Sequence, residues 1–210
     1  MKSRIPTSGI KTSRPNRMGI SRWIPKRWKK LNTMTIAFGH GLSVTPLQLA
    51  TATVPLVNGG YALPPTFLPR TRAEAMAEAT RVVSPETSAA MVELMRENVL
   101  RGSGKRANAE GYRVGGKTGT AEKVVNGRYA RHSLLNSFLS VFPTDDPQYV
   151  VLVTLDEPQR VEATNWNSTA GVNAAPTVGK VVARIAPILG VQPRFGETAS
   201  RFDAKTSATY

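Results

Sequence analysis

The residues with the clearest chemical potential are Lys117-Thr118-Gly119-Thr120, one cation and two hydroxyl groups around a glycine. From Gly111 onward the chain also fits the phosphate-binding loop pattern of Gly, four residues, then Gly-Lys-Thr, in which the lysine contacts a nucleotide phosphate. Further on, the apolar run 149–155 ends at Asp156-Glu157, where such nucleotide sites place a metal-binding carboxylate. One interpretation is therefore a P-loop ATPase that uses Gly111 to Thr118.

The surroundings of this block favour a strand over a phosphate-binding loop. A P-loop requires a buried strand before it and a helix that begins at its lysine, whereas residues 105–110 are mostly polar. After Gly119-Thr120 a β-rich run leads to Asn126-Gly127, the strongest short-range signal for a hairpin. We therefore expect Lys117 inside a strand; a helix starting there would restore the ATPase interpretation.

The composition excludes several kinds of site. The chain has 210 residues, of which 40% are hydrophobic, enough for one domain with a core. It has no cysteine, and its two histidines, His40 and His132, are far apart, so we expect no metal site and no cofactor. No apolar run approaches the ~20 residues that a membrane helix needs.

The positive charge is concentrated near the N-terminus. The net charge is +14, and residues 1–30 hold ten lysines and arginines, with no acidic residue before Glu74. Such an arm suits nucleic acid or anionic lipid, which leaves a basic polyanion-binding module as an alternative function. Because this region has three prolines and no helical period, we expect residues 1–23 to be a solvated, disordered segment.

Three helices and three strands are expected around the block. Helix signals at Thr45-Pro46 and Ser84-Pro85 predict helices over 46–57 and from 85 to Gly102, and apolar periodicity predicts a third over 174–189. Three extended runs joined by turns predict an antiparallel meander with the Lys117 strand at its outer edge; they cover 113–124, 134–142 and 149–156. The fold class is therefore α/β.

Several motifs stand in the order found in one family. They are Thr35-Ile-Ala-Phe-Gly-His-Gly with Pro46-Leu-Gln-Leu, then Gly-Gly-Lys-Thr-Gly-Thr-Ala, Phe142-Pro143, and Val151 to Pro158. In these the chain resembles the C-terminal half of a class B penicillin-binding protein of the cell-division type, a septal peptidoglycan D,D-transpeptidase. The resemblance covers residues 24–190 and implies part of a β-lactamase-like transpeptidase domain. Residues 1–23 lack it, and 191–210 form a polar C-terminal tail.

The resemblance implies an acyl-serine mechanism and a role for each residue of the block. Lys117 would attract the carboxylate of a D-Ala-D-Ala stem peptide or of a β-lactam, and the hydroxyls of Thr118 and Thr120 would hydrogen-bond it. The N–H of Thr120 would form half of the oxyanion hole. Gly119 would let the substrate lie against the strand. The resemblance also implies divisome proteins as partners and a place on the periplasmic side of the inner membrane.

The nucleophile is the point at which the chain departs from this family. The motifs Ser-x-x-Lys and Ser-x-Asn should both precede Lys117. The one Ser-x-x-Lys, Ser8 to Lys11, has no apolar helix around it to desolvate the lysine as a base, and no Ser-x-Asn follows before Lys117. We therefore expect a truncated, inactive part of a transpeptidase that does not react with β-lactams.

The remaining candidates have simpler explanations. His40, between two glycines, is expected to be a loop or packing residue, and His132 to be exposed. Asp156 and Glu157 precede Pro158, where a carboxylate commonly caps a turn. Trp23, Trp28 and Trp166 form no stacking ladder for single-stranded nucleic acid, so we expect no nucleic-acid partner.

Overall fold

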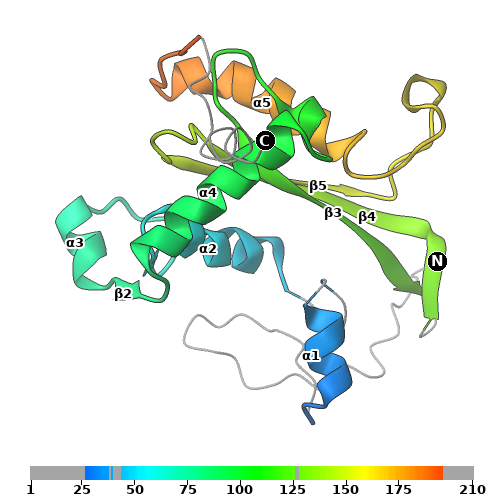
Figure 1. The fold of residues 1–210 in the computed structure, drawn as a ribbon, viewed down its shortest axis with the longest axis horizontal. Helices are drawn as coiled ribbons and strands as arrows, with labels where there is room; N and C mark the ends of the chain where they lie inside the picture. Colours follow the sequence, from blue (N-terminus) through cyan, green and yellow to red (C-terminus); the bar gives the residue numbers. More distant parts are fainter. Residues whose placement is uncertain (1–26, 38, 40–43, 126–127, 196–210) are drawn as a thin grey trace, which may run out of the picture.

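The computed structural model describes residues 27–37, 39, 44–125 and 128–195 (Figure 1). The segment expected to be disordered, the Asn126-Gly127 turn and residues 196–210 lie outside the described residues. The described elements are α1 (Lys30–Ile36), α2 (Pro46–Val57), β1 (Tyr61–Ala62), α3 (Arg72–Ala77), β2 (Thr80–Arg81), α4 (Pro85–Leu100), η1 (Lys105–Ala107), β3 (Gly115–Val125), β4 (Arg128–Phe142), β5 (Tyr149–Asp156), η2 (Glu162–Thr164) and α5 (Ala174–Ile188).

The three long strands form one antiparallel sheet in the order β3-β4-β5, which confirms the predicted meander. Lys117 lies near the start of β3 and pairs with Leu139, and β3 is an edge strand of the described sheet. No helix starts at Lys117, so the P-loop ATPase interpretation is wrong. Strand β4 begins earlier than expected, because its pairing with β3 continues to Arg128. Backbone pairing needs no apolar side chains, and the polar run 128–133 therefore concealed this part of the strand.

The predicted helices start where their capping residues stand. Thr45 Oγ1 accepts from Gln48 N at 3.2 Å, and Ser84 Oγ accepts from Thr87 N at 3.2 Å. Each bond satisfies an N–H that the first helical turn leaves free. The short helices α1 and α3 were not predicted from the sequence. For α3 a signal was present, since Thr71 and Glu74 form a capping box.

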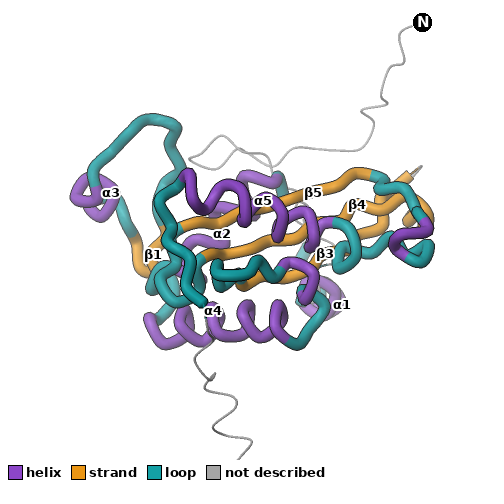
Figure 2. Tube along the Cα trace, turned by 90° about the horizontal axis from the view of Figure 1, so that it is seen from above, coloured by secondary structure: helices purple, strands orange, loops and turns teal. Residues whose placement is uncertain are grey.

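The two faces of the sheet are covered differently. Figure 2 looks onto the face covered by α5, and in Figure 1 α2 lies on the opposite side. Between α5 and the sheet lies the main core, which includes the fully buried Phe138, Phe142, Val178 and Val182. On the other face α2 and α4 enclose a smaller cluster of Val57, Val92, Met95 and Val141.

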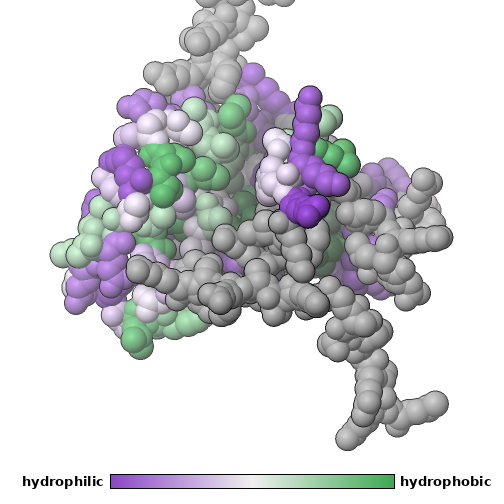
Figure 3. All heavy atoms as spheres, turned by 90° about the horizontal axis from the view of Figure 1, so that it is seen from below, coloured by the Kyte–Doolittle hydropathy of each residue, from purple (hydrophilic) through white to green (hydrophobic). Residues whose placement is uncertain are grey.

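Beside the smaller cluster, the described residues leave part of the second face uncovered. A groove of about 560 Å³ runs between α2, the loop after β1 and the start of β5, with Val54, Leu63 and Tyr149 among its lining residues. Figure 3 views the molecule from below, and hydrophobic surface is visible on that side. Among the described residues, the sheet therefore has one closed face and one partly open face.

Candidate active site on strand β3

Thr118 and Thr120 lie on the closed face of the sheet, because they pair with buried residues of β4. The Thr118 hydroxyl lies 2.8 Å from the hydroxyl of Ser103, in the loop after α4. The Thr120 hydroxyl accepts a hydrogen bond from the N–H of Ala170, before α5, at 3.0 Å. Both hydroxyls are thus held by loops that pack on β3 from the α5 side.

Lys117 and Gly119 lie on the opposite, partly open face, where they pair with Leu139 and Ser137. The Lys117 side chain is exposed. Its ammonium bends to the edge of β3, where Nζ donates to Thr118 O at 2.8 Å and lies 3.4 Å from Thr118 Oγ1. The cation and the Thr118 hydroxyl therefore meet at one place on the strand edge.

The outer edge of β3 exposes backbone groups of alternate residues. Asn98 Nδ2 donates to Gly116 O at 2.7 Å, and Lys117 Nζ donates to Thr118 O, so both carbonyls face away from β4. Backbone groups two residues apart point the same way in a strand, and the N–H of Thr120 therefore faces the same edge. Within the described part of the sheet, no strand pairs with this edge.

Gly116 and Gly119 differ in the atoms that a side chain would meet at each position. A Cβ at Gly116 would lie 2.6 Å from Leu139 O and would overlap the Phe138 ring, so packing inside the chain requires glycine there. A Cβ at Gly119 would meet only Ser137 atoms at 3.9 Å, an ordinary contact. Internal packing therefore does not explain Gly119, and the missing side chain leaves the open face beside Lys117 uncovered.

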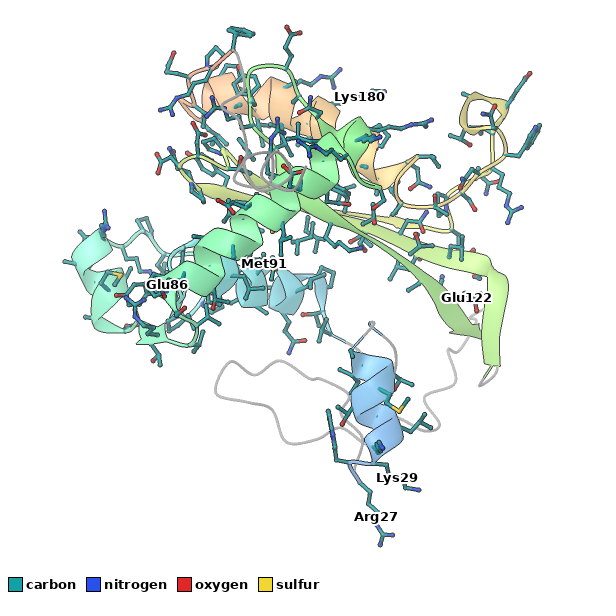
Figure 4. The ribbon with its side chains drawn as sticks, viewed as in Figure 1. Arg27, Lys29, Glu86, Met91, Glu122 and Lys180 are labelled. Atoms are coloured by element: carbon teal, nitrogen blue, oxygen red, sulfur yellow. The ribbon has the colours of Figure 1, made fainter. Side chains whose placement is uncertain are left out.

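A cluster of charged side chains lies where β3 and β5 end, near Glu122 in Figure 4. Lys123 Nζ lies 2.9 Å from Asp156 Oδ1 and 2.8 Å from Glu157 Oε1, and Ser133 donates to the same Glu157 oxygen. Hydrogen bonds from Lys123 and then Ser133 lower the pKa of Glu157, while those to Asp156 and Glu157 raise the pKa of Lys123. The two carboxylates thus tie β5 to β3, and their interpretation as turn caps was incomplete.

None of the other sequence candidates is among the residues described at this site. Ser8, Lys11, Trp23 and His40 lie outside the described residues. His132 belongs to β4, but its side chain is not among those described. Trp28 and Trp166 are 58% and 64% exposed on separate segments. Conversely, the block has three neighbours that the sequence did not predict: Asn98, Ser103 and Ala170. The serine between Gly102 and Gly104 was the one available signal.

The chain is similar to known proteins over most of its length. Residues 16–183 match the family described as penicillin binding protein transpeptidase domain. The chain belongs to this family. Within it, the chain is 42% identical over 177 residues to the probable peptidoglycan D,D-transpeptidase FtsI of Caulobacter vibrioides, covering 80% of this chain and 30% of that protein. It is 38% identical over 184 residues to stage V sporulation protein D of Bacillus subtilis, covering 82% of this chain and 28% of that protein.

Solved transpeptidase structures share the fold. The apo transpeptidase domain of Burkholderia pseudomallei penicillin-binding protein 3 matches with a TM-score of 0.71 and 32% identity, over 81% of this chain and 50% of that one. A Mycobacterium penicillin-binding protein 3 solved with ampicillin matches with a TM-score of 0.72 and 25% identity, over 86% of this chain and 43% of that one. The chain thus spans about 30% of its curated relatives. Among the described helices, none has the length and apolar character to cross a membrane.

Proposed function

We propose that this chain supplies the Lys-Thr-Gly side of the active site of an acyl-serine peptidoglycan D,D-transpeptidase. One observation carries the proposal: the Lys117 ammonium and the Thr118 hydroxyl meet at a strand edge that no described strand covers. An anionic group placed there would receive hydrogen bonds from both, and charge-assisted bonds of this kind are the stronger ones. The ligand class is the carboxylate of a D-Ala-D-Ala stem peptide or of a β-lactam.

The backbone contribution follows from the direction of the strand. The N–H of Thr120 faces the same edge as the carbonyls bound by Asn98 and Lys117. A substrate that lies along β3 would present its reacting carbonyl to this N–H, which would donate to the oxyanion as negative charge develops. Gly119 would admit the substrate against the strand.

The nucleophilic serine and its base belong to the other half of the site. Ser8 to Lys11 remains an unsupported match to the nucleophile motif, so we propose that the chain alone is inactive and unacylated by β-lactams. Alone, the lysine attracts a carboxylate weakly, by about 1 kcal/mol at contact distance in a wet groove. We further propose one partial transpeptidase domain over 24–190, between the basic segment 1–23 and the polar tail 191–210.

The partners and location follow from the family. We propose divisome proteins as protein partners, with the domain on the periplasmic side of the inner membrane. A basic polyanion-binding function of residues 1–30 would be a separate activity. Deleting those residues would abolish binding to a polyanion such as heparin without changing the β3 site.

The test joins this chain in frame to the part of the Caulobacter relative that precedes its matching region; we call the product the joined protein. Each form is incubated with a fluorescent penicillin, and its intact mass is measured. We expect no adduct on the chain alone and one adduct on the joined protein. Lys117→Ala should reduce labelling strongly, while Lys180→Ala, which removes an exposed lysine on α5 (Figure 4), should not.

Two outcomes would contradict the proposal. An adduct on the chain alone that Ser8→Ala abolishes would show that Ser8 to Lys11 is a working motif and that the chain supplies its own nucleophile. Equal labelling of the joined protein with and without Lys117 would remove the lysine from the carboxylate site.

A further inference from the structure

Two residues without an assigned role, Asn98 and Ser103, link α4 to Thr118. Asn98 lies in the last turn of α4, and its Nδ2 donates to Gly116 O at 2.7 Å. Its Oδ1 accepts from the N–H of Ser103 at 3.1 Å and from the Ser103 hydroxyl at 3.2 Å. Ser103 Oγ also lies 2.8 Å from Thr118 Oγ1, and either oxygen can be the donor.

The loop that presents Ser103 is shaped around the Asn98 amide. A Cβ at Gly102 would lie 2.9 Å from Asn98 O and closer still to Oδ1, and a Cβ at Gly104 would lie 2.9 Å from Asn98 Nδ2. From the other side, a Cβ at Gly171 would lie 2.8 Å from Ser103 O. The Gly-Ser-Gly loop thus fits closely between Asn98 and the segment before α5, and this fit fixes the position of the Ser103 hydroxyl.

The position of the Ser103 hydroxyl affects the direction in which the Thr118 hydroxyl can donate. A threonine hydroxyl has one proton and two lone pairs. Lys117 Nζ, at 3.4 Å, faces one lone pair. If the Ser103 proton points to Thr118, it occupies the second lone pair, and the Thr118 proton is free to turn toward the strand edge. If the Ser103 proton points to Asn98 Oδ1, the Thr118 hydroxyl instead donates its proton to Ser103 Oγ and cannot donate to a ligand.

We infer that Asn98 and Ser103 are positioning residues that orient the Thr118 hydroxyl as a donor to the ligand carboxylate. An anion at the edge favours the arrangement in which Ser103 donates to Thr118, because a hydrogen bond to a charged acceptor is stronger than one to a neutral oxygen. Asn98 holds Ser103 in place through the N–H bond that persists in both arrangements. The inference rests on the proposed function, since it requires a carboxylate at Thr118.

The first measurement uses the 210-residue chain itself and does not depend on activity. Threonine methyl groups are labelled with ¹³C, and three-bond couplings report the χ1 rotamer of Thr118. We expect one rotamer in the parent chain and rotamer averaging in Ser103→Ala and Asn98→Ala. Thr169→Ala is the matched control, because Thr169 is an exposed residue of the neighbouring loop. A single Thr118 rotamer in both variants would overturn the inference.

The second measurement asks whether the effect is specific to the ligand carboxylate. Acylation rates of the joined protein are compared for a penicillin and for its methyl ester, which lacks the charge. Ser103→Ala and Asn98→Ala should slow the free acid about tenfold, the expected size for a lost hydrogen bond to a charged group. The ester should react at nearly the parent rate, and Ser103→Thr, which keeps the hydroxyl, should retain acid selectivity.

The outcomes separate this inference from the proposed function. Equal slowing of acid and ester would show that Asn98 and Ser103 act only on the fold, and would overturn the inference. A parent joined protein that neither compound acylates would refute the proposed function, and the rotamer measurement would then decide the positioning role by itself.

Discussion

The two faces of the β3-β4-β5 sheet differ in how completely the chain covers them. On the α5 face, Asn136, Phe138, Ser140 and Phe142 of β4 have no exposed surface. On the other face, Leu135 is 37% exposed, Ser137 and Leu139 are half-buried, and Val141 is buried. The closed face carries Thr118 and Thr120, whose hydroxyls have partners from two loops. The open face carries Lys117, whose ammonium bonds only within its own strand in the described contacts.

This difference shows which part of the site the chain organises by itself. On the closed face, the hydroxyls of Thr118 and Thr120 are held by the loops of Ser103 and Ala170, although Thr120 itself is exposed. Among the described contacts, the exposed Lys117 ammonium has no such partner from another element. Substitutions on the two faces should therefore have different effects.

The largest expected effect is that of Phe138→Ala on the closed face. Phe138 is fully buried in the main core, and its loss should reduce the free energy of unfolding by about 3–5 kcal/mol. Leu139→Ala, the next residue on the open face, should cost clearly less because that side chain is only partly buried. Urea unfolding of the chain measures both. Equal losses would mean that the two faces are equally packed.

Substitution of Asn136 is expected to cost somewhat less. Its Nδ2 donates to Ser168 O and, at 3.1 Å, to Asn173 Oδ1, and it joins β4 to the segment before α5. Asn136→Ala removes one of the two donors to each of these acceptors and leaves a cavity at a fully buried position, which should cost about 1–3 kcal/mol. It should also speed amide hydrogen exchange at Ala170, the donor to Thr120. Unchanged exchange at Ala170 would show that the buried contacts of Asn136 do not stabilise the segment that binds Thr120.

The third effect distinguishes the two glycines of the block. Gly116→Ala places a Cβ against a backbone oxygen of β4 that cannot move freely, and should cost about 1–3 kcal/mol. Gly119→Ala meets only ordinary contacts and should leave thermal stability nearly unchanged. In the joined protein, however, Gly119→Ala should slow acylation by a penicillin. A large loss of stability from Gly119→Ala would mean that packing explains both glycines.

The smallest effect concerns the charge cluster at the end of the sheet. The lowered pKa of Glu157 means that its contribution is present above the usual value of 4.5 and is lost as pH falls through the folded pKa. The raised pKa of Lys123 means that its contribution is present below 10.5 and is lost as pH rises through the folded pKa. In Lys123→Met, the thermal unfolding midpoint should depend less on pH at both ends of this window. Added salt should reduce the difference in midpoint between the variant and the parent chain. An unchanged pH profile would show that the cluster adds no stability.

Local sequence signals predicted much of the fold because their causes are local. The caps at Thr45 and Ser84 use atoms within three residues of the helix start, and α2 and α4 begin where those residues stand. The strand through Lys117 followed from the β-rich run after Gly119 and the Asn-Gly pair beyond it. The start of β4 was misplaced because a polar run on a hairpin has no apolar period to mark it.

The sequence by itself determined the block Lys117-Thr118-Gly119-Thr120, its strand and its family resemblance, because motif order and backbone preference are written along the chain. Only the tertiary structure decided that Asn98, Ser103 and Ala170 reach this block, since they lie 15 to 50 residues away along the chain and meet it through packing. It also decided that the threonines lie on a closed face and the lysine on an open one. That division depends on which helices pack on each side of the sheet, and alternation along one strand cannot say which side that is.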